Sequence, residues 1–156
     1  MRKLIFTVLV FFTLIISYSC SKSNTNTSPP ASTNWTYDGI TYNGFVTQYD
    51  STSFPILNSK DTLGNLIYLV FNSAPTANSS YTVVENVADS AKTSPYVSIS
   101  ISPATSNVSY ISTGKVGDGV HVTVVDGKLH ATFSDCTITN FTEVTTVSGT
   151  LIQNFP

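Results

Sequence analysis

The chain has 156 residues, of which 41% are hydrophobic, and its seven basic residues are outnumbered by nine acidic ones. No cluster of basic residues occurs in the sequence, so the electrostatic signature of a nucleic-acid-binding protein is missing and no such partner is predicted. The length allows one domain of ordinary size and excludes two.

The first twenty residues predict export. The basic pair Arg2 and Lys3 is followed by an apolar run, Leu4–Ile16, and then by small and polar residues that end at Cys20. A basic start, an apolar segment and a short zone of small residues are typical of a secretory signal peptide. The apolar run is shorter than the roughly 20 residues that a membrane-spanning helix needs.

The position of Cys20 adds to this interpretation. Cys20 follows a small serine and precedes the polar stretch 21–24, Ser-Lys-Ser-Asn. This arrangement resembles a bacterial lipoprotein signal, although the usual leucine three positions before the cysteine is Ser17 here and the next residue is Tyr18. The signal is similar to the relaxed forms found in small lipoproteins of the Bacteroidetes phylum. The resemblance implies a signal peptide at residues 1–19 and a lipid attached to Cys20.

The resemblance also implies a location. Ser21 beside the lipidated cysteine favours the outer membrane, with the domain facing the periplasm. Display on the cell surface in this bacterial group relies on acidic residues just after the cysteine, whereas this chain has Lys22, Ser23 and Asn24 there. Without the signal peptide, five lysines face nine acidic residues, a formal charge of −4, so membrane binding must rest on the acyl chains. The triacylated cysteine that the resemblance implies is sufficient, because several acyl chains hold a protein stably whereas one holds it only marginally.

Residues 20–34 are predicted to form a lipidated, flexible tether. The segment Ser21–Thr33 reads SKSNTNTSPPAST. Small polar residues with a Pro-Pro pair bury too little apolar surface to offset the entropy lost on ordering. One folded domain is therefore predicted over residues 35–156.

The domain opens with a predicted β-hairpin, Trp35–Tyr42, whose central Asp-Gly pair is the strongest short-range turn signal. With a two-residue turn, one face of this hairpin carries four large side chains: Trp35, Tyr37, Ile40 and Tyr42. We expect this face to belong to the core, because the opposite face holds only threonines. The alternative is a ligand-binding platform on which sugar rings stack, since Trp and Tyr combine an apolar ring with a polar group.

Further strands are predicted where β-branched and aromatic residues gather between turn signals. They cover residues 66–71, 81–87, 95–101, 108–112, 135–141 and 144–152. Leu66–Phe71 is apolar on both faces, which favours a place in the middle of a sheet. In Pro95–Ile101, the residues Val97, Ile99 and Ile101 alternate with serines and are expected to point inward.

A second Asp-Gly pair, Asp126-Gly127, predicts the hairpin Val120–Phe133 together with its register. Val125 faces Lys128 beside the turn, and the pairing continues stepwise until Val120 faces Phe133. The face expected to be buried carries Val120, Val122, Val124, Leu129, Ala131 and Phe133. The other face is mostly polar and includes His121 and His130, as in an antiparallel pair with one side in water.

Short strands separated by regular turn signals predict an all-β fold. We expect an antiparallel β-sandwich, immunoglobulin-like or related, with a small β-barrel as the alternative. The hairpin Trp35–Tyr42, the strand Ser79–Val84 and the segments Gly127–Phe133 and Val147–Leu151 resemble small secreted β-sandwich lipoproteins of the same bacterial group. Most of those relatives have no assigned activity, so the resemblance bears on the fold far more than on the function.

The only two histidines, His121 and His130, occupy diagonal positions on the polar face of the second hairpin. Two imidazoles could begin a metal site, but a zinc site needs three or four protein ligands and the sequence specifies no third one nearby. We therefore expect two solvated or partly covered histidines and predict no metal and no cofactor.

Cys136 is expected to be a buried free thiol that behaves as a small apolar residue. The alternative is a disulfide between Cys20 and Cys136 in a chain that is not processed as a lipoprotein. A catalytic thiolate needs an electropositive neighbourhood, and the adjacent Asp135 argues against one.

Two functions of different classes remain open. The sequence carries no catalytic motif, so the first is a non-enzymatic envelope lipoprotein whose β-domain is a structural module or binds another envelope protein. The second is a carbohydrate-binding accessory lipoprotein that uses exposed aromatic residues. That function requires an exposed patch drawn from Trp35, Tyr37, Tyr42, Tyr49 and Tyr110.

Overall fold

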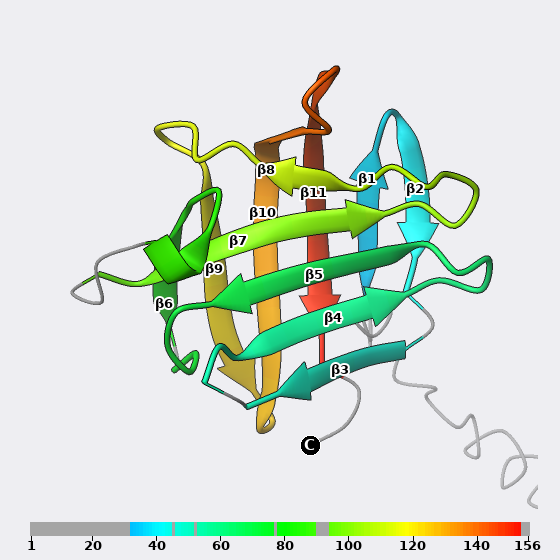
Figure 1. Ribbon diagram of the computed structural model, residues 1–156. Coiled ribbons are helices and arrows are strands. Elements are labelled where there is room, and N and C mark those ends of the chain that lie inside the picture. The colour runs from blue at the N-terminus through cyan, green and yellow to red at the C-terminus, as the bar shows by residue number, and fades with distance from the viewer. Residues whose placement is uncertain (1–31, 45, 52, 77, 90–93, 154–156) are drawn as a thin grey trace, which may run out of the picture. The chain divides into compact units, whose positions relative to one another are not determined.

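Eleven β-strands and one short 3-10 helix make up the described part of the chain (Figure 1). The computed structural model describes residues 32–44, 46–51, 53–76, 78–89 and 94–153. The predicted signal peptide, Cys20 and nearly all of the predicted tether lie outside these residues. By its internal contacts the chain divides into two units, Met1–Pro30 and Ala31–Pro156, and the second unit is the one described below.

The elements follow one another along the chain with short connections. They are β1 Asn34–Tyr37, β2 Ile40–Asn43, β3 Val46–Asp50, β4 Ile56–Lys60, β5 Leu66–Phe71, β6 Ser79–Val83, η1 Val87–Asp89, β7 Tyr96–Ser102, β8 Tyr110–Ser112, β9 Gly119–Val125, β10 Lys128–Thr139 and β11 Val144–Ile152. None of the helical structure in the described ranges has the length and hydropathy required to span a bilayer.

One continuous sheet folds over to form both layers of the domain. Its strand order is β2-β1-β11-β10-β9-β6-β7-β5-β4-β3, and β8 pairs with both β7 and β10. In Figure 1 the strands β3, β4, β5, β7 and β8 form the front layer and cross the upright strands β9, β10, β11, β1 and β2 behind them. Crossed layers are the orthogonal form of sheet packing. The prediction of an all-β fold is confirmed, and the arrangement is consistent with both a sandwich and a barrel-like sheet.

β6 joins the two layers at their shared side. It pairs antiparallel with β9 of the rear layer and parallel with β7 of the front layer. The sheet is therefore mixed, whereas the sequence predicted antiparallel pairing throughout. A parallel pair requires a crossover connection, and the segment from the end of β6 to β7, which contains η1, provides it.

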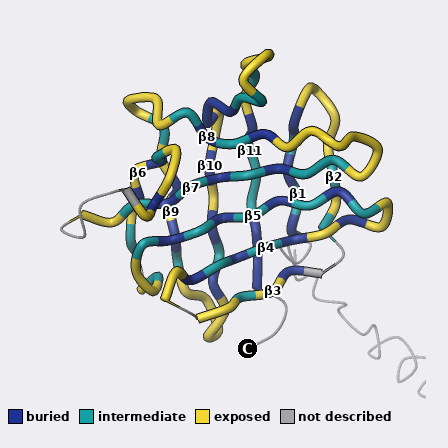
Figure 2. Tube along the Cα trace, in the orientation of Figure 1, coloured by how far each residue is buried: buried dark blue, intermediate teal, exposed yellow. Residues whose placement is uncertain are grey.

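The core lies between the layers and contains the inward residues of nearly every strand (Figure 2). The largest fully buried side chains are Trp35, Phe71, Leu57, Ile67, Leu69, Ile99, Ile101, Ile138 and Leu151. Burial of one such side chain stabilises the fold by about 1.5–3 kcal/mol. The alternation of buried and half-buried positions in β5 and β7 is the two-residue period of a strand with one face on the core.

The register predicted for the second hairpin is confirmed at all six pairs, from Lys128 with Val125 to Phe133 with Val120. One residue of its apolar face departs from the prediction, because Val124 is 39% exposed. The neighbouring strand β6 ends its pairing with β9 at Val122. Val124 therefore lies beyond the covered part of the hairpin, beside the turn.

β10 is longer than the sequence predicted. Two separate strands were expected around Ser134, but β10 continues through a β-bulge between Phe133 and Cys136. Asp135 adopts a positive φ of 50° in this bulge, and its backbone amide donates a hydrogen bond to Ser148 Oγ at 2.8 Å. The extra residue changes the alternation of faces, so that Phe133 and Cys136 both point into the core.

Strands β3 and β4 were not predicted, because their inward face is partly polar. Thr47 and Ser59 are fully buried and lie across from each other, with their hydroxyl oxygens 3.1 Å apart. A buried hydroxyl pair satisfies its own hydrogen bonds, but it does not produce the apolar period from which a strand is predicted.

The other strands agree in part with the prediction. β5 lies between β4 and β7 in the middle of the front layer, as expected, although Leu66, Tyr68 and Val70 on its outer face are only half-buried. In β7 the predicted inward residues are buried. The segment predicted over 81–87 forms β6 and then η1 instead of one strand.

Replacement of Phe133 by alanine tests the register of the second hairpin. Phe133 is 4% exposed, so Phe133→Ala should lower the free energy of unfolding by about 3–5 kcal/mol in urea denaturation. The control His130→Ala changes an outward residue of the same strand and should cost less than about 1 kcal/mol. Equal losses for the two variants would contradict the assignment of faces.

Candidate binding site

The four large residues of the first hairpin divide between the core and the surface. Trp35 is fully buried and Tyr37 is 9% exposed, so the core interpretation is confirmed for both. Tyr42 is half-buried and stacks on Trp35, with ring centroids 5.7 Å apart. Ile40 at the turn is 55% exposed. The face of the Trp35 ring is therefore not available to a sugar.

Tyr37 meets a second tyrosine that comes from the other layer. Its ring lies 4.9 Å from that of Tyr110, at the start of β8, with 57° between the ring planes. The Tyr110 hydroxyl donates a hydrogen bond to Glu143 Oε2 at 2.9 Å. The two rings and this carboxylate join the end of β1, the start of β8 and the loop between β10 and β11.

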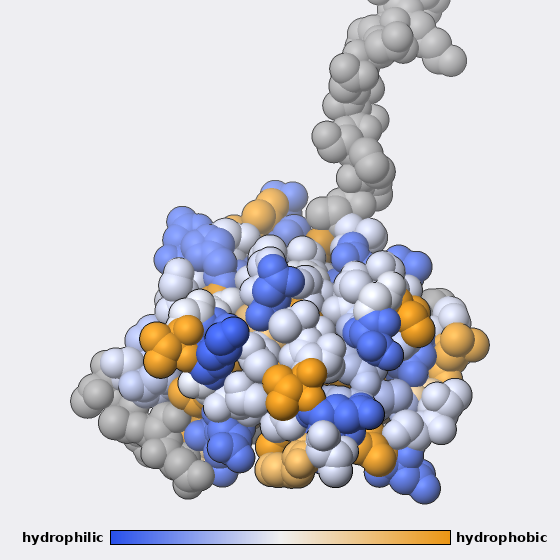
Figure 3. Space-filling model, turned by 90° about the horizontal axis from the view of Figure 1, so that it is seen from above, coloured by the Kyte–Doolittle hydropathy of each residue, from blue (hydrophilic) through white to orange (hydrophobic). Residues whose placement is uncertain are grey.

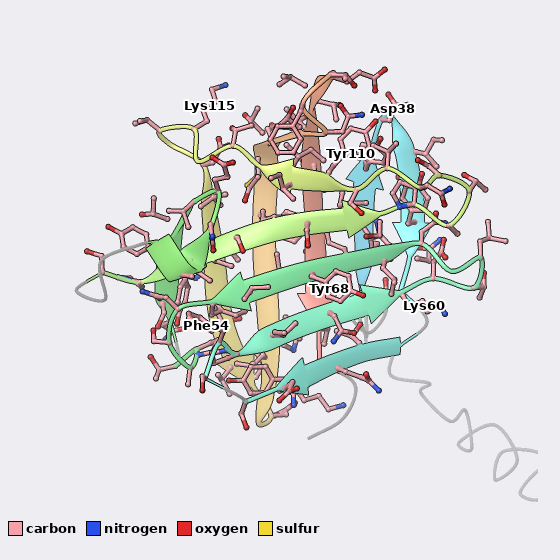
Figure 4. All side chains as sticks on the ribbon, viewed as in Figure 1. Asp38, Phe54, Lys60, Tyr68, Tyr110 and Lys115 are labelled. Atoms are coloured by element: carbon pink, nitrogen blue, oxygen red, sulfur yellow. The ribbon has the colours of Figure 1, made fainter. Side chains whose placement is uncertain are left out.

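A cleft of about 300 Å³ opens beside these groups, and we call it the Tyr37–Tyr110 cleft. It is lined by Tyr37, Asp38, Tyr110, Glu143, Val144 and Thr145. Figure 4 shows Asp38 and Tyr110 together at the upper end of the domain, with Lys115 on a separate loop. Among the described residues that line the cleft, the charged ones are Asp38 and Glu143, and both are acidic and exposed.

The environment of Tyr37 keeps its phenol protonated. Burial raises the pKa of Tyr37 well above its ordinary value, and a hydrogen bond with Tyr110 and the negative charges nearby, including Asp38, add to the effect. A neutral phenol is a hydrogen-bond donor at physiological pH. Tyr37, Tyr110 and Glu143 thus form a short hydrogen-bonded chain along the cleft wall.

Local sequence fixes both acidic residues. Asp38 and Gly39 have φ angles of 50° and 71°, the paired positive values that an Asp-Gly hairpin turn requires. In the other loop, Asn140 Oδ1 accepts a hydrogen bond from the backbone amide of Glu143 at 2.7 Å, and Thr139 Oγ1 donates one to the Glu143 carbonyl at 2.7 Å. The backbone at both carboxylates is therefore fixed by turn geometry.

The two histidines lie on the outer face of the second hairpin, as predicted. His121 is exposed and faces Thr132, while His130 is half-buried and faces Thr123. His121 Nδ1 lies 3.3 Å from Ser80 Oγ beside a shallow hollow of about 320 Å³. In the described ranges of the chain, no group of three or more metal-ligating side chains is gathered.

Cys136 is a free, fully buried cysteine, as expected. Its sulfur lies 3.6 Å from the carbonyl oxygen of Gly119 and 3.8 Å from that of Ser134, and its single proton can be donated weakly to either. Burial raises the pKa of Cys136 to about 11, and the charge of Asp118 adds to this effect. The thiol is neutral at physiological pH, as expected for a side chain that packs as a small apolar residue.

Exposed apolar residues are scattered over the surface. Figure 3 views the domain from the end that carries the cleft, and hydrophobic residues appear there as separate spots among hydrophilic ones. The most exposed are Val116 at 98%, Phe141 at 79%, Leu63 at 78% and Val144 at 70%. Val144 lines the Tyr37–Tyr110 cleft, so the cleft has one apolar side.

Comparison of the chain with models of protein families, with curated proteins and with solved structures finds no match. The site must therefore be interpreted from its own geometry.

Sequence reasoning identified only part of this site. Tyr37 and Tyr110 were candidates for sugar stacking, whereas Asp38 entered the prediction only as part of its Asp-Gly turn and Glu143 was not considered. Tyr49 packs against the core and stays outside the cleft. No spacing in the sequence signals that Tyr37 and Glu143 line the same cleft, because β1 and the β10–β11 loop are far apart along the chain.

The burial of Trp35 predicts a simple spectroscopic result. Trp35 is the only tryptophan, so the emission of the folded protein should be blue-shifted and insensitive to acrylamide. Unfolding in guanidinium should shift the emission to the red and allow quenching. Efficient quenching of the folded protein would contradict the assignment of Trp35 to the core.

Proposed function

We propose that this chain is an exported lipoprotein of the bacterial envelope, anchored through Cys20, whose β-domain is a non-enzymatic binding module. The signal sequence supports the export and the anchor. The Tyr37–Tyr110 cleft supports binding as the role of the domain.

The observation that carries the proposal is the position of the cleft relative to the point where the chain enters the fold. Thr33 is buried, and its hydroxyl accepts a hydrogen bond from the amide of Ile152 at 2.8 Å and donates one to the Ile152 carbonyl at 3.1 Å. Thr33 therefore lies at the C-terminal end of β11, whereas Val144 and Thr145 of the cleft lie at its N-terminal end. A domain held at Thr33 presents the cleft at its far end, which suits a membrane-tethered receptor.

Metabolic labelling with an alkyne fatty acid tests the anchor. The wild-type chain should incorporate the label, and Cys20→Ala should not, because the acyl chains are attached to that cysteine. Cys136→Ala is the matched control, since it removes the only other cysteine, and it should label like the wild type. Labelling of Cys20→Ala at the wild-type level would refute the anchor.

Carbohydrate binding is a second candidate, and one feature of the front layer favours it. Tyr68 lies on the outer face of β5, and Figure 4 shows it near the middle of this layer. Its cross-strand neighbours are Asn58 and Ser100, and Gln48 continues the same row. An aromatic ring beside amide and hydroxyl groups can stack on a sugar and hydrogen-bond its hydroxyls.

A glycan array separates this candidate from the first. If the front layer binds a glycan, Tyr68→Ala should weaken the signal about tenfold, the equivalent of about 1.4 kcal/mol. Tyr96→Ala, which truncates another half-buried tyrosine of the same layer, should leave it unchanged. Binding that survives Tyr68→Ala, or no binding by the wild type, would exclude this face as a glycan site.

A further inference from the structure

We propose that the Tyr37–Tyr110 cleft binds a small organic cation through its primary ammonium group. This inference rests on the proposed binding function of the domain and specifies the class of ligand. It follows from the charge, the walls and the size of the cleft.

The charge of the cleft is of one sign. Asp38 and Glu143 contribute two carboxylates, and no lysine, arginine or histidine is among the lining residues. An ammonium group that contacts either carboxylate forms charge-assisted hydrogen bonds, which are about twice as strong as neutral ones. An anion would be repelled.

One oxygen of the Glu143 carboxylate is left free for such a ligand among the described residues. Tyr110 donates to Oε2, and within the described structure Oε1 accepts no hydrogen bond. The bond from Tyr110 restricts the rotation of the carboxylate without neutralising its charge. A ligand ammonium can therefore bind Oε1 without first displacing a side-chain partner.

The walls add a second form of recognition for a cation. Tyr37 and Tyr110 are both more than nine-tenths buried, and both line the cleft. A cation within about 6 Å of the face of a tyrosine ring is attracted to its π-electrons. The phenol of Tyr37 is neutral at physiological pH, like that of any tyrosine, and burial raises its pKa further.

The size of the cleft limits the ligand. Its volume of about 300 Å³ is at the lower end of the range for small-molecule sites. Val144 offers an apolar surface for the carbon skeleton of the amine. An amino sugar, a short diamine or a lysine-like side chain all have a suitable size and charge.

The test uses full-length protein in a non-ionic detergent, titrated by NMR at about pH 6, where amines are protonated and carboxylates are ionised. The probes are glucosamine, its neutral counterpart N-acetylglucosamine, and cadaverine. Glucosamine and cadaverine should shift resonances of the cleft, and N-acetylglucosamine should not. Added salt should weaken binding, because the carboxylates are close to solvent.

Variants localise the interaction. Glu143→Gln and Asp38→Asn should each weaken the binding of both amines about tenfold, a loss expected when one of two charged partners is removed. The control is Asp126→Asn, because Asp126-Gly127 forms the same type of turn, with φ angles of 50° and 76°, in the other hairpin. It removes an identical charge outside the cleft and should leave binding unchanged.

Each outcome bears on the proposal. Equal binding of the two sugars would show recognition of hydroxyl groups and overturn it, as would the absence of shifts with either amine. Equal weakening by Asp126→Asn would show that only the net charge matters, which also overturns it. The labelling of Cys20 does not depend on amine binding. A negative NMR titration would therefore reject this ligand class without rejecting the lipid anchor, and the two proposals can fail separately.

Discussion

The close contact between β1 and β11 is the constraint on which the rest of the domain depends. Trp35 lies opposite Gly149 in this pair, and a Cβ atom at Gly149 would lie 2.6 Å from the carbonyl oxygen of Asn34 and 2.9 Å from Trp35 Cα. Only glycine allows the two strands to approach so closely. The approach buries the largest side chain of the protein, and Tyr42 of β2 stacks on it.

The same contact sets the position of the cleft. β1 has only four residues, so the location of Trp35 fixes where Tyr37 and Asp38 emerge. Tyr110 reaches Tyr37 because β8 pairs with both layers, with β7 through Ile111 and Ser100 and with β10 through Ile111 and Thr139. The proposed binding cleft thus lies where one strand bridges the crossed sheets.

The sequence predicted the features that depend on near neighbours. The Asp126-Gly127 turn and the alternation around it determine the complete register of the second hairpin, because both signals lie within fourteen residues. The same reasoning wrongly predicted that Val124 is buried, because the exposure of Val124 depends on where β6 ends. β3 and β4 were missed because Thr47 and Ser59 bury hydroxyl groups where periodicity requires apolar side chains. The bulge at Asp135 was likewise hidden, because only contact with Ser148 identifies it.

The candidate site was harder to predict than the fold because it too depends on contacts between segments that are far apart in the sequence. Its aromatic residues could be chosen as candidates from their residue type alone. Glu143 can be recognised as part of the site only when β8 is placed beside β10. An acidic residue in a loop is typical of any soluble surface. The hydrogen bond from Tyr110 distinguishes this one, and a contact across 33 positions has no signature in the sequence.

The hydrogen bonds at Thr33 have a mechanical consequence. β1 pairs with β2 on one side and β11 on the other, and Thr33 is joined to Ile152, to Thr47 and, through its carbonyl, to the amide of Gly44. A pull on the chain at residue 32 therefore acts along β1 and loads both ladders in shear, so that many hydrogen bonds must break together. A pull across the strand would instead open the ladder one bond at a time. If the chain is anchored at its N-terminus and holds a ligand at the opposite end, as proposed, traction between the two would act along β1, the direction in which its hydrogen bonds resist best.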